Sequence, residues 1–168
     1  MGISVGVDIG GTKILAGIVN DQGQILSKVR KKTPRADASA VLEVVGEVIA
    51  ETIANVDGSI AGIGVGVAGP VDAASTTVLY APNLQWADVP VAALLENVTG
   101  LPVLVENDGS AAAWGEARFG GGKGFQDVVT VTIGTGIGGG IVLGGELFRG
   151  SHGAAGEIGL MGAVADGL

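Results

Sequence analysis

Alternating apolar and polar residues at the start of the chain predict three short strands in succession. The strands are expected at residues 3–9, 14–19 and 24–29. A Gly-Gly-Thr-Lys turn separates the first two. The sequence Asn-Asp-Gln-Gly at residues 20–23, which is typical of a hairpin loop, separates the second from the third. This part of the chain is therefore expected to form an antiparallel meander.

A helical period replaces this alternation in the next part of the chain. Apolar residues recur at helical spacing from Val41 to Val56, with Asp37 or Ser39 as the candidate N-cap and Gly58 as the candidate stop. Further strands are expected at residues 60–69 and 102–105, and further helices at residues 91–100 and 108–120. This mixture of strands and helices indicates an α/β fold.

The stretch Gly-Gly-Gly-Lys-Gly at residues 120–124 has the composition of a connector. After it, the order strand, glycine turn, strand, glycine turn repeats the order found at the start of the chain. We therefore expect two lobes built on one plan. The first α/β lobe is expected at residues 1–119, and the start of a second lobe at residues 125–168.

Composition and charge narrow the class of protein. A chain of 168 residues with 47% hydrophobic and 15% charged residues is typical of a globular protein. Its net charge of −8 argues against nucleic-acid and anionic-membrane partners, which require clustered Lys and Arg. Cysteine is absent, and no apolar run approaches the length of a membrane span. With no secretory leader in the sequence, a cytoplasmic location is expected.

Two glycine-rich stretches match the dinucleotide-binding fingerprint Gly-x-Gly-x-x-Gly, at residues 64–69 and 134–139. That fingerprint requires a helix directly after the glycines, so that the helix N-terminus can meet a pyrophosphate. Here the first stretch continues into Pro70, and the second continues into another apolar strand. We therefore expect neither stretch to form a dinucleotide site.

Two other glycine turns are better candidates for binding phosphate. Residues 8–13, Asp-Ile-Gly-Gly-Thr-Lys, and residues 132–136, Thr-Ile-Gly-Thr-Gly, each set a Gly/Thr turn between two strands. The tip of such a turn can bind phosphate through its backbone N–H groups, and the hydroxyls of Thr12 and Thr135 add further hydrogen-bond donors. An ordinary glycine hairpin explains either turn alone. The presence of one such turn in each lobe favours a different interpretation. The two turns would together hold the β- and γ-phosphates of ATP, and Asp8 would orient Mg²⁺.

A buried apolar strand runs directly into the polar residues Glu106, Asn107 and Asp108, where a helix is expected to begin. Asp108 is either a plain N-cap or a general base at the mouth of a cleft. In the same way, Asn83 can be a turn asparagine, and Glu157 can be a solvated loop carboxylate. The local sequence leaves these alternatives open.

Six motifs, taken in order, give the chain a resemblance to a known family. They are GVDIGGTK, GVAGPV, APNLQW, VENDGSAAAWGE, GTGIGGGIVLGGELFRG and GAAGEIG. Together they resemble the ROK family of sugar kinases (repressors, open reading frames, kinases), and its bacterial glucokinases in particular. The resemblance implies an actin-like, ribonuclease H-like ATPase fold, in which two α/β lobes hold ATP and sugar in the cleft between them.

The resemblance also implies roles for individual residues. Asp108 corresponds to the general base that takes the proton from the sugar 6-hydroxyl as this hydroxyl attacks the γ-phosphate. The residues that correspond to sugar-binding positions are Asn83, Asn107, Asp108 itself and Glu157. The positions on the ATP phosphate loops are Gly10, Gly11, Thr12, Lys13, Gly134, Thr135 and Gly136, with Asp8 beside the first loop.

The last part of the chain departs from the family pattern. Leu160 stands where the family has a histidine that ligates zinc and lies beside the sugar. Leucine can neither ligate a metal nor bond a hydroxyl, so no zinc site is expected. The chain also stops at Leu168, near where a Cys-rich motif of the family would begin. A complete first lobe and an incomplete second lobe are therefore expected.

The function expected from the resemblance is ATP-dependent phosphorylation of a hexose 6-hydroxyl, with glucose as the sugar and ATP and Mg²⁺ as cofactors. Two alternatives stay open. One is a truncated or degenerate ROK protein without catalysis, and the other is a sugar-sensing ROK regulator. The expected partners are the sugar substrate and, for a full-length protein, further copies of itself. Neither nucleic acid nor a membrane is expected.

Overall fold

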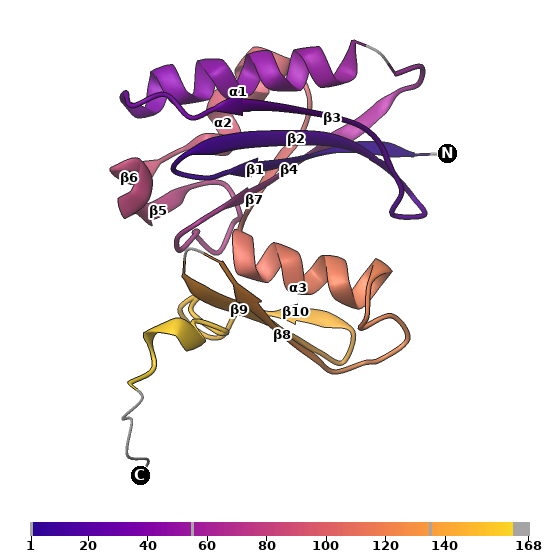
Figure 1. The fold of residues 1–168 in the computed structure, drawn as a ribbon, viewed down its shortest axis with the longest axis vertical. Helices are drawn as coiled ribbons and strands as arrows, with labels where there is room; N and C mark the ends of the chain where they lie inside the picture. The colour runs from indigo at the N-terminus through magenta and orange to yellow at the C-terminus, as the bar shows by residue number, and fades with distance from the viewer. Residues whose placement is uncertain (1, 55, 135, 163–168) are drawn as a thin grey trace. The chain divides into compact units, whose positions relative to one another are not determined.

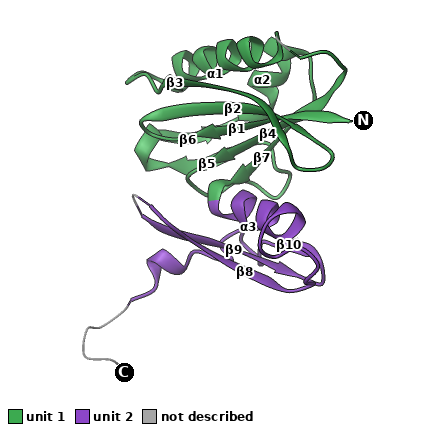
Figure 2. Cartoon of the chain, turned by 45° about the vertical axis from the view of Figure 1, so that its right-hand side comes forward, with its two compact units in different colours: residues 1–108 green, residues 109–168 purple. Residues whose placement is uncertain are grey.

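The computed structural model describes residues 2–54, 56–134 and 136–162. Its chain divides into two compact units, residues 1–108 and residues 109–168 (Figure 2). This boundary falls at the start of a helix, whereas the connector predicted at residues 120–124 follows that helix within the second unit. Each unit has a main sheet of its own (Figure 1).

Unit 1 is built on a five-stranded mixed sheet with the strand order β3-β2-β1-β4-β7. Its strands are β1 (Ile3–Ile9), β2 (Lys13–Asn20), β3 (Ile25–Lys32), β4 (Ile60–Val67) and β7 (Val103–Asn107). The first three pair antiparallel, which confirms the predicted meander, whereas β4 and β7 run parallel to β1. The carboxyl ends of β1, β4 and β7 therefore share one edge of the sheet, which is where α/β sheets bind ligands.

Helices α1 (Ala38–Ile53) and α2 (Val91–Thr99) lie on one face of this sheet (Figure 1). Alternate residues of the strands are buried on that face, and in β1 these are Ile3, Val5, Val7 and Ile9. Removing this apolar surface from water stabilises the unit by about 25 cal/mol per Å². Within the described parts of the chain, no helix is both long and apolar enough to cross a membrane.

The start of α1 follows the sequence prediction, but its end does not. Asp37 is the N-cap, because its side chain accepts a hydrogen bond from the Ala40 amide at 3.0 Å. The predicted stop was Gly58, yet the helix ends at Ile53. Val56 donates to the Ile53 carbonyl at 3.1 Å and packs against the core after the helix has ended. Apolar residues at helical spacing therefore continue beyond the last residue of the helix.

The opposite face of the unit 1 sheet carries glycines and polar residues. Gly6 and Gly64 lie opposite each other on β1 and β4, and a side chain at either position would meet nothing within 4 Å. One row nearer the carboxyl edge, Asp8 and Glu106 share this face, because Gly66 pairs with both of them. This face therefore presents backbone and carboxylates toward the edge that holds the candidate site.

A short antiparallel ladder of β5 (Val78–Ala81) and β6 (Trp86–Val89) was not predicted from the sequence. The 3-10 turn η1 (Pro82–Leu84) joins the two strands, and Gln85 closes it in the left-handed region with φ 58°. Trp86 is only 1% exposed and anchors the ladder to the core. The turn presents Asn83, the candidate sugar ligand of this segment, at the surface.

Helix α3 (Asp108–Phe119) begins at the boundary between the units and belongs to unit 2 from Gly109 onward. A three-stranded antiparallel sheet with the order β10-β9-β8 follows it. Its strands are β8 (Val128–Ile133), β9 (Ile137–Leu143) and β10 (Glu146–Phe148), and the 3-10 turn η2 (Ile158–Leu160) comes after them. The predicted order of strand, glycine turn, strand and glycine turn is thus confirmed.

Candidate active site

The turn between β1 and β2 is the first candidate phosphate site, and its backbone is held at three points. The Gly10 amide donates to the Lys13 carbonyl at 2.9 Å, which closes the turn. Thr33, just beyond β3, donates its hydroxyl to the Gly10 carbonyl at 2.6 Å and its amide to the Thr12 carbonyl at 3.1 Å. The conformation of the tip is therefore fixed before any ligand binds.

The tip nevertheless leaves donors available. Among the described residues, no hydrogen bond engages the amides of Gly11 and Thr12 or the Thr12 hydroxyl. Gly11, Thr12 and Lys13 are all exposed. Two exposed amides, a hydroxyl and an ammonium group form the set of donors that a phosphate group needs.

The turn η1 lies directly against this tip, although the sequence separates them widely. A Cβ at Gly11 would lie 3.1 Å from the Asn83 carbonyl oxygen and 3.3 Å from the Asn83 Cβ. The absence of a side chain at Gly11 therefore allows η1 to approach the turn. As a result, the candidate sugar ligand Asn83 and the candidate phosphate turn are neighbours.

The carboxylate of Asp8 lies near the end of β1, on the face of the sheet that carries no helix of unit 1. It is half-buried, and this burial raises the pKa of the Asp8 carboxyl above its ordinary value. The Lys13 ammonium lowers that pKa, and the negative charge of Asp108 raises it. Asp8, Lys13 and Asp108 are therefore close enough for their charges to interact.

Asn107 ends β7 and is held to the loop that follows β4. Its side-chain amide donates to the Gly69 carbonyl at 3.3 Å, and its backbone amide donates to Glu106 Oε1 at 3.0 Å. Gly69 has φ 152°, and a Cβ there would collide with the Tyr80 carbonyl oxygen, so only glycine suits this crossing. The loop after β4 thus positions the side chain that precedes Asp108.

Asp108 is the first residue of α3 and is exposed. A carboxylate in the first helical turn interacts favourably with the positive end of the helix dipole. This location is compatible both with a role in starting the helix and with a role as base, since an exposed carboxylate is accessible to a hydroxyl. The structure brings Asp108 and Asp8 near the same edge of the sheet, as the parallel strand order requires.

The second glycine turn lies in unit 2, between β8 and β9. Gly134 donates its amide to the Gly136 carbonyl at 2.9 Å, and both residues are exposed. The remaining residue of this turn, Thr135, lies outside the described residues. The turn is thus a tight glycine hairpin, as the sequence predicted.

Glu157 also lies in unit 2, immediately before η2, and is half-buried. The segment around it packs closely on β9, because a Cβ at Gly156 would lie 2.9 Å from the Gly139 carbonyl oxygen. Gly156 has φ 91°, a conformation that favours glycine. Leu160, at the end of η2, is 83% exposed. Glu157 is therefore placed by a glycine segment packed on the strand that follows the second turn.

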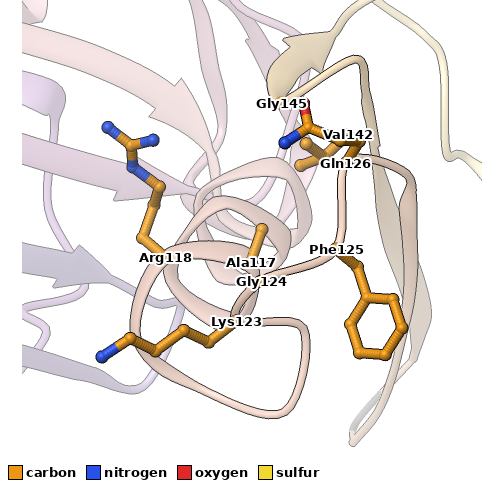
Figure 3. Close-up of a pocket in the computed structure, with 8 residues that line it drawn as sticks. All are labelled: Ala117, Arg118, Lys123, Gly124, Phe125, Gln126, Val142 and Gly145. Carbon is orange, nitrogen blue, oxygen red and sulfur yellow. The ribbon is translucent and has the colours of Figure 1, made fainter.

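A cavity of about 290 Å³ lies elsewhere in unit 2, beyond the end of α3 (Figure 3). Ala117, Arg118, Phe125 and Gln126 are among its lining residues, and none of the predicted site residues lines it. The Arg118 side chain points away from Phe125 and stacks over the Trp114 ring, with 4.7 Å between the guanidinium carbon and the ring centroid. This cavity is therefore distinct from the residues that the motifs single out.

Two residues that matter for the site were missed by the sequence analysis. Thr33 carried no signal, because a threonine before a proline suggests only an extended residue or a turn. Gly69 was considered as part of an expected strand, of a dinucleotide fingerprint and of the motif GVAGPV, whereas its role is to let the loop after β4 cross β5. The positive φ of Gly69 follows from the fold and cannot be read from the sequence.

Comparison with solved structures identifies the fold. A ROK family glucokinase from Streptomyces griseus, in complex with glucose and AMPPNP, superposes with a TM-score of 0.90 at 46% sequence identity. The superposition covers 99% of this chain and 52% of that one. Unit 1 and unit 2 therefore have the actin-like ATPase fold that the resemblance implied.

Sequence comparison identifies the family. The sequence pattern of the ROK family matches residues 4–167, and the chain belongs to that family. A glucokinase from Streptomyces coelicolor is 47% identical over 168 residues, which are 100% of this chain and 52% of the relative. A putative xylose repressor from Caldicellulosiruptor is 38% identical, over 96% of this chain and 41% of the repressor. The chain thus spans about half the length of the curated relatives it matches.

Proposed function

We propose that this chain carries the general base, the first phosphate turn and part of the sugar site of an ATP-dependent hexose kinase, with glucose as the sugar. One observation carries the proposal. The phosphate turn of unit 1, with its unengaged amides at Gly11 and Thr12, lies against Asn83. Asp8, beside that turn, interacts electrostatically with Asp108. The similarity to glucokinases, at 47% identity, supports the same function.

In the proposed reaction, the 6-hydroxyl oxygen of the sugar attacks the γ-phosphorus of ATP. A new oxygen–phosphorus bond forms, the bond from the γ-phosphorus to the bridging oxygen breaks, and ADP leaves. The Asp108 carboxylate accepts the proton of the hydroxyl. Phosphoryl transfer depends mainly on positioning and charge neutralisation, so one carboxylate base, a metal ion and two amide cradles would suffice.

The other residues would position the two substrates. Asn83 and Asn107 would bind sugar hydroxyls in unit 1, and Glu157 would do so in unit 2. The amides of Gly11 and Thr12 and the Lys13 ammonium would bind one face of the ATP phosphates. The turn at residues 134–136 would bind the other face.

Mg²⁺ fits the donor set near Asp8. Within the described ranges, no group of three or more His, Cys, Asp or Glu side chains gathers. Mg²⁺ does not require such a group, because it commonly uses one or two carboxylates together with phosphate oxygens and water. Asp8 would hold the ion or its waters, and the bound ion would neutralise charge on the transferring phosphate.

A second candidate function is sugar sensing without catalysis. Leu160 stands where the family has a histidine, and its side chain is 83% exposed. Because leucine is apolar, it offers a sugar no polar contact there. The 38% identity to a putative xylose repressor gives this alternative independent support. A sensor of this kind would bind a hexose and would not transfer phosphate to it.

A coupled assay of ADP release over a panel of hexoses tests the proposal. We expect ADP release that depends on glucose and exceeds that with mannose, N-acetylmannosamine or fructose. Isothermal titration with glucose accompanies the assay. Binding of glucose without ADP release in the presence of any hexose would refute the kinase and support the sensor. The absence of both glucose binding and ADP release would refute both functions.

A further inference from the structure

Strand β8 combines an uncharged sequence with an unusually high exposure of its apolar side chains. Residues 128–133 read Val-Val-Thr-Val-Thr-Ile, without a charged residue, a proline or a glycine. Val129, Val131 and Ile133 are 66%, 52% and 85% exposed. Alternate side chains of a strand point to the same face, so these three form one row, which we call the apolar row. Contiguous exposed apolar residues of this kind mark interaction surfaces.

The apolar row belongs to the face of the unit 2 sheet that is turned away from α3. The other face packs on α3, because a Cβ at Gly140 would lie 2.8 Å from the Gly109 carbonyl oxygen. On the face of the apolar row, η2 approaches β9, since a Cβ at Gly139 would lie 3.4 Å from Ile158 Cδ1. Even with η2 in place, the three side chains of the apolar row keep at least half of their surface in contact with water. Packing within unit 2 therefore does not account for the row.

The edge of β8 that faces away from β9 is also available. β8 is an edge strand of its sheet, whose order is β10-β9-β8. Over the described parts of the chain, no backbone hydrogen bond outside the β8–β9 ladder engages residues 128–133. The outward N–H and C=O groups of β8 can therefore pair with one further strand.

Edge strands are usually protected against such pairing by charged residues, by short length or by a bulge. β3, an edge strand of unit 1, has Lys or Arg at four of its positions. β10, the other edge strand of the unit 2 sheet, is three residues long and begins with Glu146. β8 has none of these protections, because it is uncharged and its register with β9 is continuous from Val128 to Ile133. The sequence of β8 therefore favours a partner strand.

The sequence of β8 is self-complementary in an antiparallel pair. If Val131 lies opposite Val131 of a second copy, then Val129 lies opposite Ile133, and Thr130 lies opposite Thr132. Apolar side chains then meet on one face and threonines on the other, and both kinds of cross-strand pair are favourable. A register shifted by one residue would instead set threonine opposite valine or isoleucine. The chain has a net charge of −8, yet no like charges would meet along this strand.

We propose that unit 2 associates with a second copy of itself through β8, so that two three-stranded sheets join into one continuous sheet. The two-fold axis passes by Val131, and the interface is isologous, because the same strand serves both copies. Each copy has one such edge, so the association closes at a dimer. The competing occupant is a strand from a different segment, such as the half of the relatives that this chain does not match. That occupant would leave the chain monomeric.

Disulfide cross-linking of single-cysteine variants tests the association and its register together, because the chain has no cysteine of its own. Opposite Cα atoms of an antiparallel pair lie about 4.5–5.5 Å apart, a separation that a disulfide spans. Val131→Cys should therefore give a cross-linked dimer on oxidation. Val129→Cys is the matched control, because its two cysteines would be offset by about 13 Å along the strands and should not cross-link. The double variant Val129→Cys, Ile133→Cys should restore cross-linking.

Sedimentation equilibrium measures the association without cysteines. The unsubstituted chain should pass from monomer to dimer as its concentration rises. Val131→Lys sets two ammonium groups opposite each other, so the dissociation constant should rise at least about tenfold. Leu26→Lys, on the edge strand β3, adds the same charge at another exposed apolar position and should leave the dimer intact.

Three results would overturn the inference. The first is a chain that stays monomeric at every concentration. The second is cross-linking of Val129→Cys as efficient as that of Val131→Cys, which would mean that the copies do not meet in this register. The third is equal weakening by Leu26→Lys and Val131→Lys, which would make the effect one of net charge. None of these measurements involves a sugar or a nucleotide, so their outcome is independent of the proposed function.

Discussion

Thr33 links the end of β3 to the first candidate phosphate turn through two hydrogen bonds. Its hydroxyl and its amide donate to the carbonyls of Gly10 and Thr12, at 2.6 Å and 3.1 Å. Both acceptors flank Gly11, whose amide is one of the unengaged donors. At the scale of single residues, the geometry of the turn therefore depends on a side chain outside every recognised motif.

Replacing Thr33 with valine should loosen this turn. Valine keeps the shape of threonine and removes the hydroxyl donor to the Gly10 carbonyl, which is worth about 1 kcal/mol. We expect ATP to bind about fivefold more weakly, which corresponds to the same free energy. Thr33→Ser keeps the donor and should bind ATP as the unsubstituted chain does. Equal ATP affinities of all three proteins by titration calorimetry would show that the hydroxyl does not organise the turn.

Asp8 should make the stability of unit 1 depend on pH. Burial is the main cause that raises the pKa of this carboxyl, so the folded state binds its proton more tightly than the unfolded state does. The stabilising contribution of the protonated form is fully present below the unfolded pKa of 3.8 and is lost as pH rises through the raised pKa. At neutral pH the charged carboxylate is therefore unfavourable.

The substitution Asp8→Asn should accordingly raise the free energy of unfolding at pH 7. This gain should shrink as the pH is lowered through the pKa of Asp8, because the unsubstituted side chain then becomes neutral too. Urea unfolding at a series of pH values measures the difference. Asp21→Asn, in the exposed turn between β2 and β3, is the matched control for the loss of one negative charge. A gain that is equal at every pH would contradict the assignment to charge burial.

At the scale of elements, the packing of α3 on β9 depends on Gly140. A Cβ there would lie 2.6 Å from the Ala113 Cβ and 2.8 Å from the Gly109 carbonyl oxygen, both on α3. Gly115, on the same helix, is different, because a Cβ would meet nothing within 4 Å. The two glycines therefore have opposite consequences for substitution by alanine.

Gly140→Ala should destabilise unit 2 by about 1–3 kcal/mol, as overpacking of a tight contact does. Gly115→Ala should stabilise α3 by about 0.5–1 kcal/mol, since glycine is unfavourable inside a helix. Hydrogen exchange of the α3 amides reports on this element directly, with faster exchange expected in the first variant and slower exchange in the second. Slower exchange in Gly140→Ala would mean that α3 does not pack on β9 as described.

Among the elements, those with a long period or a clear cap could be predicted from the sequence. The meander of β1, β2 and β3 and the N-cap Asp37 of α1 follow from local pattern and side-chain chemistry. The ladder of β5 and β6 could not be predicted, because its strands are short and its turn requires Gln85 at φ 58°. Such a conformation depends on tertiary packing around Trp86 and leaves no periodic signal.

The candidate site also has one part that could be predicted from the sequence and one part that could not. The motifs singled out the residues of the first turn and Asp108, and parallel β1, β4 and β7 explain why these lie at one edge. The contact between Gly11 and Asn83 could not be predicted, since it depends on the unpredicted ladder. The total charge could likewise be predicted from the sequence, whereas the arrangement of the cations could not. The net charge of −8 argued against nucleic acid and anionic membranes, whereas the register between β2 and β3 places several cations on one face of the sheet.

At the scale of the whole molecule, each unit contains some of the predicted site residues. Unit 1 contains Asp108, the first candidate phosphate turn, Asn83 and Asn107. Unit 2 contains the second turn and Glu157. The central claim concerns Asp108, because it is the only residue in the proposal to which a proton transfer is assigned. A test of the account must therefore separate loss of catalysis at Asp108 from loss of sugar binding.

The most direct measurement is the rate of glucose-dependent ADP formation by Asp108→Asn, with glucose affinity measured in parallel. Asparagine keeps the shape of the side chain and cannot accept the proton, so the rate should fall about 10²- to 10⁴-fold. Glucose affinity should change little, and Asp21→Asn should keep the full rate. A rate within tenfold of the unsubstituted chain would contradict the assignment of Asp108 as the general base.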